Sequence, residues 1–187
     1  MIIGITSLIG GGKEEATKRI SEKLGIPSCS HSDFLRNELK KQGKEITRKS
    51  LQDLGNELRA KYGNDYITLQ LIESNKDKKS YIAESIRNPD EVNALKKFAD
   101  FILIAVIADQ RLRFERVMTR QREEGAKTFE EFKKVDEREH NDLSLGGMRI
   151  LECIKMADFI IYNNGSLEEL YAQLDELIEQ IKKKCLI

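Results

Sequence analysis

A glycine-rich stretch near the N-terminus, SLIGGGKEE, has the residue types that hold phosphate groups. Gly10, Gly11 and Gly12 run directly into Lys13, after the apolar residues MIIGIT. Glycines let a loop wrap its backbone N–H groups around phosphate oxygens, and a lysine adds a mobile positive charge. A helix that begins at this point would favour anions further through its free N–H groups and its dipole. The stretch therefore predicts a phosphate-binding loop.

The match to the pattern G-x-x-x-x-G-K-[ST] is incomplete at two positions. Ser7 occupies the first glycine position, and Glu14 occupies the position of the hydroxyl that ligates magnesium. A carboxylate there would repel bound phosphates, by about 1 kcal/mol for two unit charges about 4 Å apart in water. Glu14 either ligates the metal directly, since magnesium favours oxygen ligands, or turns into solvent. We predict the second, because the helix dipole stabilises an outward carboxylate there.

Strands and helices that alternate along the chain must position this loop. Apolar runs of strand length, rich in β-branched and aromatic residues, occur at Ile2–Thr6, Tyr81–Ala83, Phe101–Ile107 and Phe159–Tyr162, with a weaker run at Ile26–Ser30. They show little alternation, which is typical of strands buried on both faces of a parallel sheet. We predict an α/β fold of three layers, a five-stranded parallel sheet with helices on both faces.

Helical patterns fill the intervals between the strands. The first predicted helix, Glu14–Leu24, follows the glycines. Apolar stripes at helical spacing contain, in the middle of the chain, Leu51, Leu54, Leu58 and Tyr62, and near its end Leu167, Leu170, Leu174, Leu177, Ile178 and Ile181. Helix starts are predicted at Asn88-Pro89, Thr128…Glu131 and Ser166…Glu169, and Gly63 ends the first of the two stripes.

The composition predicts one domain that spans residues 1–187. Hydrophobic residues make up 40% of the chain, charged residues 34%, and the net charge is zero. This balance removes the whole-protein argument for binding to nucleic acid or to a membrane surface. The three cysteines lack metal-ligand spacing, and no apolar run approaches the roughly 20 residues that span a bilayer. We expect a cytoplasmic protein whose partners are small molecules.

Four further stretches contain charged or polar residues next to predicted strand ends. They are SHSDFLRNELKKQGKEIT, YIAESIRNPDEV, RLRFERVMTRQREEGAKTFEEFKKVDEREHN and ADFIIYNNGSLEEL. In the third, Arg113, Arg116 and Arg120 repeat at helical spacing, a repulsion that an anion or carboxylates must offset. With the glycine loop, these stretches resemble the nucleoside monophosphate kinase group of P-loop kinases, and most closely its archaeal-type adenylate-kinase-like or dephospho-CoA-kinase-like branch.

The resemblance implies an acceptor-binding side of the site. Arg36 and Arg87 would hold the phosphate of the acceptor, with Asp33 nearby. Glu84, at the end of a strand, would support magnesium through water. Residues 33–76, which include Leu51–Gln70, would form a helical acceptor-binding lobe.

The resemblance also implies a donor side. Gly10, Gly11, Gly12 and Lys13 would contact the ATP phosphates, with Glu14 beside them on the donor side, and Arg116 would pack on the donor base. Asn163, Asn164 and Gly165 would hold the adenine through backbone contacts. Residues 121–141 would form a small lid. Arg120 and Arg138 would bind the transferring phosphate, and Val135 stands where the branch usually has another arginine.

The function implied by this resemblance is transfer of a phosphoryl group from ATP, with Mg²⁺, to a nucleoside or deoxynucleoside monophosphate. Lys13, Arg87, Arg120, Arg138 and Asp33 would be the catalytic residues. One alternative is a dephospho-CoA kinase, in which Asp33 would act as the base for a ribose hydroxyl. Another is a nucleotide-binding protein without transfer activity, which the departures at Ser7, Glu14 and Val135 would explain.

Overall fold

The computed structural model describes residues 1–97, 100–119, 127–140 and 147–185. Within these residues the elements are, in chain order, β1 (Ile2–Thr6), α1 (Lys13–Leu24), β2 (Ser28–Ser30), α2 (His31–Lys41), α3 (Arg48–Tyr62), α4 (Tyr66–Ser74), β3 (Tyr81–Glu84), α5 (Pro89–Leu95), β4 (Phe101–Ile107), α6 (Gln110–Thr119), α7 (Phe129–His140), α8 (Ile150–Lys155), β5 (Phe159–Tyr162) and α9 (Leu167–Cys185).

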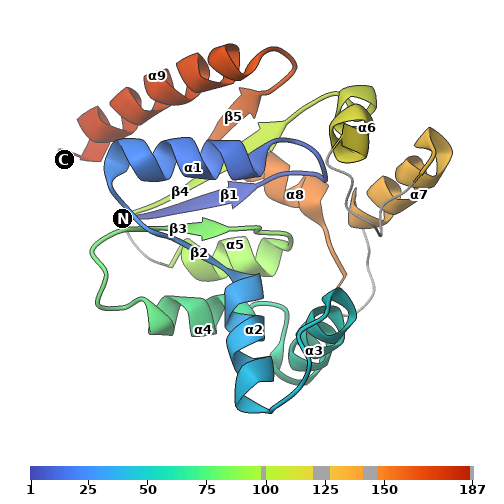
Figure 1. Cartoon of the computed structure of the whole chain (residues 1–187). Coiled ribbons are helices and arrows are strands. Elements are labelled where there is room, and N and C mark those ends of the chain that lie inside the picture. The colour runs from blue at the N-terminus through green and yellow to red at the C-terminus, as the bar shows by residue number, and fades with distance from the viewer. Residues whose placement is uncertain (98–99, 120–126, 141–146, 186–187) are drawn as a thin grey trace.

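The five strands form one parallel sheet in the order β2-β3-β1-β4-β5, which confirms the predicted α/β fold. The register pairs Ile5 of β1 with Glu84 of β3, and Glu84 in turn with Ser30 of β2. The carboxyl ends of all strands therefore meet at one edge, and Figure 1 shows that α3, α6 and α7 lie toward this side. Ligands of open α/β sheets bind at this edge.

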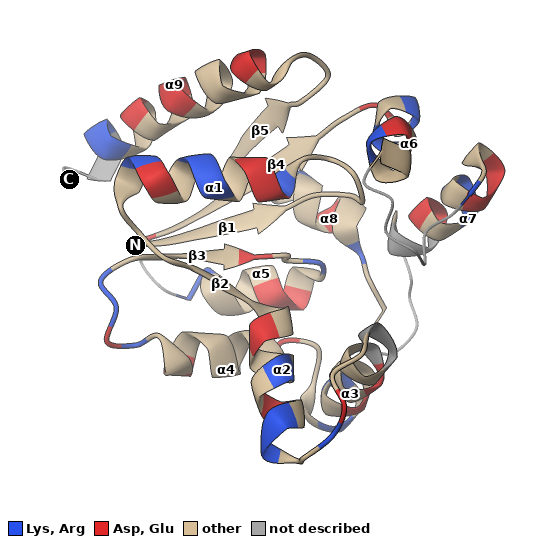
Figure 2. Cartoon of the chain, viewed as in Figure 1, with Lys and Arg blue, Asp and Glu red and all other residues tan. Residues whose placement is uncertain are grey.

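Helices α1 and α9 cover one face of the sheet (Figure 1). Successive residues of a strand point to opposite faces, so Ile3 and Ile5 of β1 both enter this core, where they meet Ile20 of α1 and Leu174 of α9. Burying a side chain of this size stabilises the fold by about 1.5–3 kcal/mol. The outward side of α1 shows acidic and basic residues in alternation (Figure 2).

Helices α4, α5 and α8 contribute to the core on the other face, together with Ile2, Ala83 and Leu103 from the strands. Gly4 of β1 lies on this face, and a Cβ atom there would come within 2.5 Å of Ile86 Cδ1. The glycine therefore lets the chain that follows β3 pack directly against β1.

Helices α2, α3 and α4 form a unit with a small core of its own, built from Leu35, Leu39, Leu54 and Ile67. In Figure 1 these helices lie together below β2, the edge strand on that side of the sheet. We refer to them as the α2–α4 lobe. They fall within residues 33–76 except at the start of α2, which begins at His31 with Ser30 as its cap.

The three predicted caps are confirmed. The side chain of Asn88 accepts a hydrogen bond from the N–H of Asp90, and Pro89 begins α5. Glu131 and Thr128 bond each other's backbone at the start of α7, and Glu169 and Ser166 do so at the start of α9.

At three places the burial differs from what the apolar patterns in the sequence indicate. Strand β5 is not buried on both faces: as an edge strand it exposes Ile160 by 42% and Tyr162 by 59%. Leu167 is 45% exposed, because it lies in the first turn of α9, before the helix reaches the sheet. Tyr62 is 50% exposed and stacks on Tyr66 where α3 ends. Among the described residues, no helix is long and apolar enough to cross a membrane.

Candidate functional site

The glycine loop joins β1 to α1, as predicted. Gly10 and Gly12 have φ values of 76° and 101°, in the region that favours glycine. A Cβ atom on Gly10 would come within 2.6 Å of the carbonyl oxygen of Arg113, and one on Gly12 would collide with the side-chain amide of Asn163. The loop therefore needs these glycines both for its turn and for its close contact with α6 and the end of β5.

Lys13 and Glu84 face each other across the ends of two adjacent strands. Lys13 Nζ lies 3.9 Å from Glu84 Oε2, with side-chain exposures of 25% and 18%. The pairing of Ile5 with Glu84 in the sheet places Glu84 beside the glycine loop that follows β1. Glu14, the next residue along α1, is exposed, as predicted. The arrangement places one partly buried cation and one partly buried carboxylate beside the phosphate-binding loop.

The donor set at this place fits magnesium. The described residues contain no group of three or more His, Cys, Asp or Glu side chains that could hold a metal ion by themselves. Magnesium in nucleotide enzymes usually binds through one or two carboxylates, water and substrate phosphates, without a complete protein cage. Glu84 at the end of β3 is a carboxylate of this kind.

The chain leaves β3 through a strained turn. Ser85 has φ 63°, a left-handed conformation that a non-glycine residue adopts at a cost of about 1–3 kcal/mol. The turn is held because Thr6 Oγ1 donates to the carbonyl of Ile86 at 2.9 Å and Ile86 N donates to Ile5 O at 3.1 Å. The turn places Glu84 and Arg87, which are three residues apart, at the same end of β3. Such strain is often kept at functional sites.

Arg36 and Asp33 form an ion pair on the first turns of α2. Arg36 Nη1 lies 3.0 Å from Asp33 Oδ1, and Ser30 Oγ donates to Asp33 Oδ2 at 2.8 Å. The side chains of Arg36 and Asp33 are 47% and 64% exposed. Ser30 is next to Glu84 in the sheet, so α2 starts beside the site.

Arg113, expected on a crowded basic helix face, is instead buried and 3% exposed. The carboxylate that offsets its charge is Asp136 of α7, bonded by Arg113 Nη1 at 2.5 Å and by Nη2 at 2.7 Å. Arg113 Nη1 also donates to the carbonyl of Ile9 in the glycine loop at 3.0 Å. Burial opposes the charge of Asp136, but bonds from Arg113 and Gln110 outweigh it and lower the pKa of Asp136. Arg113 thus connects α7 to the phosphate-binding loop.

Asn163 at the end of β5 supports the glycine loop with its side chain. Asn163 Nδ2 donates to Gly11 O at 3.0 Å, and Asn163 Oδ1 accepts from Arg116 Nη2 at 3.3 Å. Next to it, Asn164 exchanges two hydrogen bonds with Asp109 after β4. Arg116 and the Asn163–Gly165 turn are therefore brought together with the loop, as expected for one site.

Glu91 of α5 is a buried carboxylate that the sequence reasoning missed. It is 1% exposed, and Glu91 Oε2 accepts from the backbone N–H groups of Arg87 and Asn88 at 2.8 and 3.2 Å. Glu91 Oε1 faces His31 Nδ1 at 3.5 Å and Arg59 Nη2 at 3.9 Å. The spacing of Asn88 and Glu91, a capping box, was the one signal in the sequence.

His31 completes this network. Its Nε2 atom is 2.9 Å from Thr68 Oγ1 of α4. Burial lowers the pKa of His31 despite the attraction of Glu91, and the positive charges of Arg59 and Arg87 lower it further. Burial also lowers the pKa of Arg59, against the attraction of Glu91 and together with the repulsion of Arg87. Glu91 thus connects α2, α3 and α5 at the end of β3.

Two predicted site residues cannot be placed. Arg120 lies outside the described residues, as do residues 121–126 of the predicted lid. The side chain of Arg138 also lies outside them. Val135 is 40% exposed on α7. The roles assigned to these residues remain predictions.

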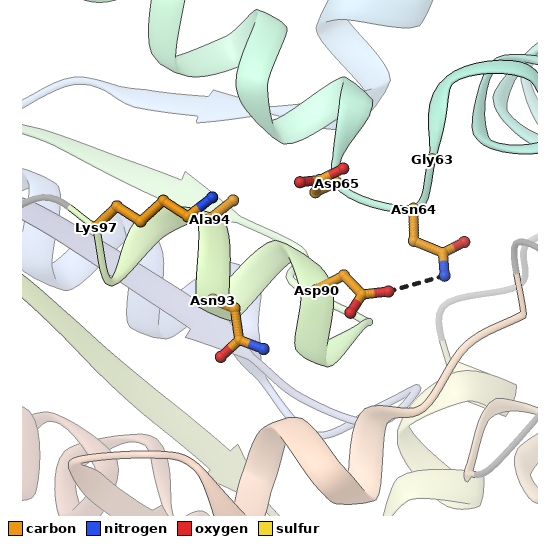
Figure 3. A pocket seen from close by; sticks show the side chains of 7 residues that line it. All are labelled: Gly63, Asn64, Asp65, Asp90, Asn93, Ala94 and Lys97. Carbon is orange, nitrogen blue, oxygen red and sulfur yellow. Dashed lines mark hydrogen bonds between the residues drawn. The ribbon is translucent and has the colours of Figure 1, made fainter.

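A pocket of about 370 Å³ lies between the α3–α4 turn and α5 (Figure 3). Asn64 Nδ2 donates to Asp90 Oδ2 at 2.9 Å at one side of it. It contains none of the predicted site residues. Its lining is Gly63, Asn64, Asp65, Asp90, Asn93, Ala94 and Lys97.

Comparison with known proteins places the chain in a family. A family model described as an AAA domain matches residues 8–133. A UPF0200 protein of Methanocaldococcus jannaschii is 37% identical over 185 residues, which cover 97% of this chain and 90% of the relative. A UPF0200 protein of Thermococcus kodakarensis is 31% identical over 191 residues, covering 98% of this chain and all of the relative.

Solved structures of other proteins share the fold. TT1252 from Thermus thermophilus matches with a TM-score of 0.64 and 22% identity, over 96% of this chain and 97% of that one. A shikimate kinase from Aquifex aeolicus matches with a TM-score of 0.56 and 16% identity, over 100% and 99%. A gluconokinase from Sinorhizobium meliloti matches with a TM-score of 0.53 and 13% identity, over 97% and 95%. The chain belongs to the UPF0200 family, and its AAA domain has the fold of the P-loop kinases.

Proposed function

We propose that the protein transfers the terminal phosphoryl group of ATP to a nucleoside or deoxynucleoside monophosphate. The observation that carries the proposal is the pair of Lys13 and Glu84, 3.9 Å apart beside the glycine loop. A cation for the phosphates and a carboxylate for magnesium are the two groups that phosphoryl transfer requires beside such a loop. The kinase fold of the structural neighbours supports the same reading.

Different residues of this chain bind the phosphate donor and the acceptor. The N–H groups of the glycine loop and Lys13 bind the donor phosphates. Glu84 would hold magnesium through water, and the metal would supply positive charge beside these phosphates. Arg87 and Arg36 bind the acceptor. An oxygen of the acceptor phosphate bonds to the γ-phosphorus, and the bond from that phosphorus to the β-phosphate oxygen breaks. The products are ADP and a nucleoside diphosphate.

The state of Asp33 favours a phosphate acceptor over a hydroxyl acceptor. A hydroxyl nucleophile benefits from a base within reach, and Asp33 is the candidate that the sequence offers. Both of its oxygens are already engaged, one by Arg36 and one by Ser30. A phosphate acceptor is largely ionised at neutral pH, so it needs no base. Asp33 then serves to orient Arg36.

The proposal is tested with Lys13→Ala and a nucleotide panel. We expect wild-type protein with ATP and Mg²⁺ to form ADP and a nucleoside diphosphate from one or more monophosphates. Lys13→Ala should lower kcat/KM by at least about tenfold, since a hydrogen bond to a charged group contributes about 1.5–3 kcal/mol. Lys18→Ala, an exposed lysine of α1, is the matched control. ATP binding without product for any acceptor would instead indicate a nucleotide-binding protein without transfer activity.

A further inference from the structure

The guanidinium of Arg59 has unused hydrogen-bonding capacity in a largely buried place. Its side chain is 17% exposed, and a guanidinium has five N–H donors. Its closest charged group is Glu91, whose Oε1 is 3.9 Å from Arg59 Nη2, longer than a hydrogen bond. Within the part of the chain that the structure describes, no hydrogen bond involves this guanidinium. None of its nitrogen atoms is among the fully buried atoms without a partner, so these donors are open to an acceptor that enters from solvent.

Arg87 is in a similar state beside it. Its backbone N–H bonds Glu91, but its guanidinium makes one described contact, a long one of 3.8 Å from Nη1 to the sulfur of Met148. The repulsion between Arg59 and Arg87 is strong enough to affect the pKa of Arg59. Both side chains therefore present unsatisfied donors at the carboxyl end of β3, one from the α2–α4 lobe and one from the sheet.

The surrounding charges leave a positive excess at this place. Glu91 faces Arg59 and His31 with its side chain and bonds Arg87 at the backbone N–H, and burial keeps His31 mainly neutral at pH 7. Among the described residues of this cluster, the two guanidiniums and the one carboxylate give an excess of one positive charge. Glu91 already accepts two backbone N–H groups through Oε2, so it cannot turn fully toward the arginines.

We propose that Arg59 and Arg87 together form the anion-binding part of the acceptor site, and that their ligand is a phosphate monoester. The proposal rests on the function proposed above and names a residue of the α2–α4 lobe that the resemblance did not. A phosphate monoester has three terminal oxygens that accept hydrogen bonds, and its charge of nearly −2 suits a pair of guanidiniums. Arg36, which is exposed and paired with Asp33, would then add a second and weaker contact to the acceptor.

Glu91, His31 and Thr68 have a positioning role in this arrangement. Thr68 of α4 contacts His31 of α2, and His31 contacts Glu91 of α5. Glu91 in turn holds the backbone of Arg87 and attracts Arg59 of α3. This chain of contacts fixes the lobe against the end of β3, so that the two arginines are kept in place before the ligand arrives. Preorganised donors bind an anion with less loss of conformational freedom.

Binding measurements on Arg59→Met test the proposal. Met keeps much of the length of the side chain and leaves no buried charge. The affinity of the intact protein for nucleoside 5′-monophosphates should fall by about tenfold or more, whereas its affinity for ATP should stay within about twofold. The parent nucleosides, which lack the phosphate, should bind equally to the variant and the wild type. Lys61→Met, an exposed lysine two residues along α3, is the matched control.

A second variant, Arg59→Lys, separates weakened binding from a loss of folding. It keeps a positive charge near Glu91 but loses the planar fork, so we expect a native thermal transition with monophosphate binding still weakened. The inference is overturned if either folded variant binds monophosphates as wild type does, if ATP binding falls instead, or if wild-type protein binds no monophosphate. If monophosphates bind in an Arg59-dependent manner but no phosphoryl group is transferred, the inference stands and the proposed function fails.

Discussion

The buried pair of Arg113 and Asp136 makes Asp136→Asn the most informative stability variant. Asp136 is fully buried, and Arg113 is 4% exposed at its side chain. Asp136 accepts from Arg113 twice, from Gln110 at 2.9 Å, and is 3.2 Å from His140 Nε2. The amide of Asn keeps the shape of the carboxylate but removes its charge and one of its acceptors. The guanidinium of Arg113 would then stay buried without an opposite charge.

The expected cost follows from that uncompensated charge. Removing one partner of a buried ion pair destabilises a protein by about 3–5 kcal/mol. For a chain of this size each kcal/mol shifts Tm by about 2–4 °C, so we expect a loss of about 6–20 °C. Because the pKa of Asp136 is lowered in the fold, its contribution is present above about pH 4 and is lost as the pH falls below that value.

Urea unfolding at pH 7, followed by circular dichroism, measures the loss. Glu73→Gln is the matched control, since Glu73 and Lys76 form an exposed ion pair at 2.6 Å. Such a pair contributes about 0–1 kcal/mol. If Asp136→Asn loses no more free energy of unfolding than Glu73→Gln does, the buried pair does not hold α7 in the way described.

A double variant separates the ion pair from the space it fills. Arg113→Met with Asp136→Leu removes both charges next to the ring of Phe132, which packs near Phe114. We expect it to be less destabilised than the sum of the single variants by at least about 1 kcal/mol. It should nevertheless weaken ATP binding, because the carbonyl of Ile9 loses its donor. Additive effects of the two changes would contradict direct coupling.

Two further predictions concern pH and the metal. Because burial lowers the pKa of His31 in the fold, the unfolded chain takes up the proton first, and stability should fall as the pH drops below about 6.5, by at most about 1.4 kcal/mol per pH unit. Unfolding between pH 7 and 5 should show this slope in wild type and His140→Gln but not in His31→Gln, and an equal slope in His31→Gln would rule out His31 as its source. Glu14→Ser restores the hydroxyl that ligates magnesium, so turnover or the affinity for Mg²⁺ should rise. Identical Mg²⁺ titrations of wild type and Glu14→Ser at saturating ATP and acceptor would contradict the assigned position of Glu14.

Local sequence signals determined much of the fold. Runs of apolar residues defined β1, β3 and β4 within about one residue, since a strand buried on both faces must be apolar along its whole length. The capping pairs at Asn88, Thr128 and Ser166 defined helix starts, because a side chain that bonds the backbone three residues away acts within one turn. The glycines before Lys13 predicted the tight loop, because glycine adopts the positive φ values that such a turn needs. These features depend on neighbours in the sequence, so the sequence is sufficient to find them.

The partners of the charged residues were decided only by the tertiary structure. Arg113 looked like one of three arginines on a basic helix face, yet it meets Asp136, 23 residues away. Arg59, His31 and Glu91 come from three helices and meet because the α2–α4 lobe packs against α5 at the end of β3. The sequence does not distinguish a charged side chain that is solvated from one that pairs with a buried partner. Helical spacing determines only which side of its own helix the residue lies on. Which helix packs opposite is set by the order of strands in the sheet.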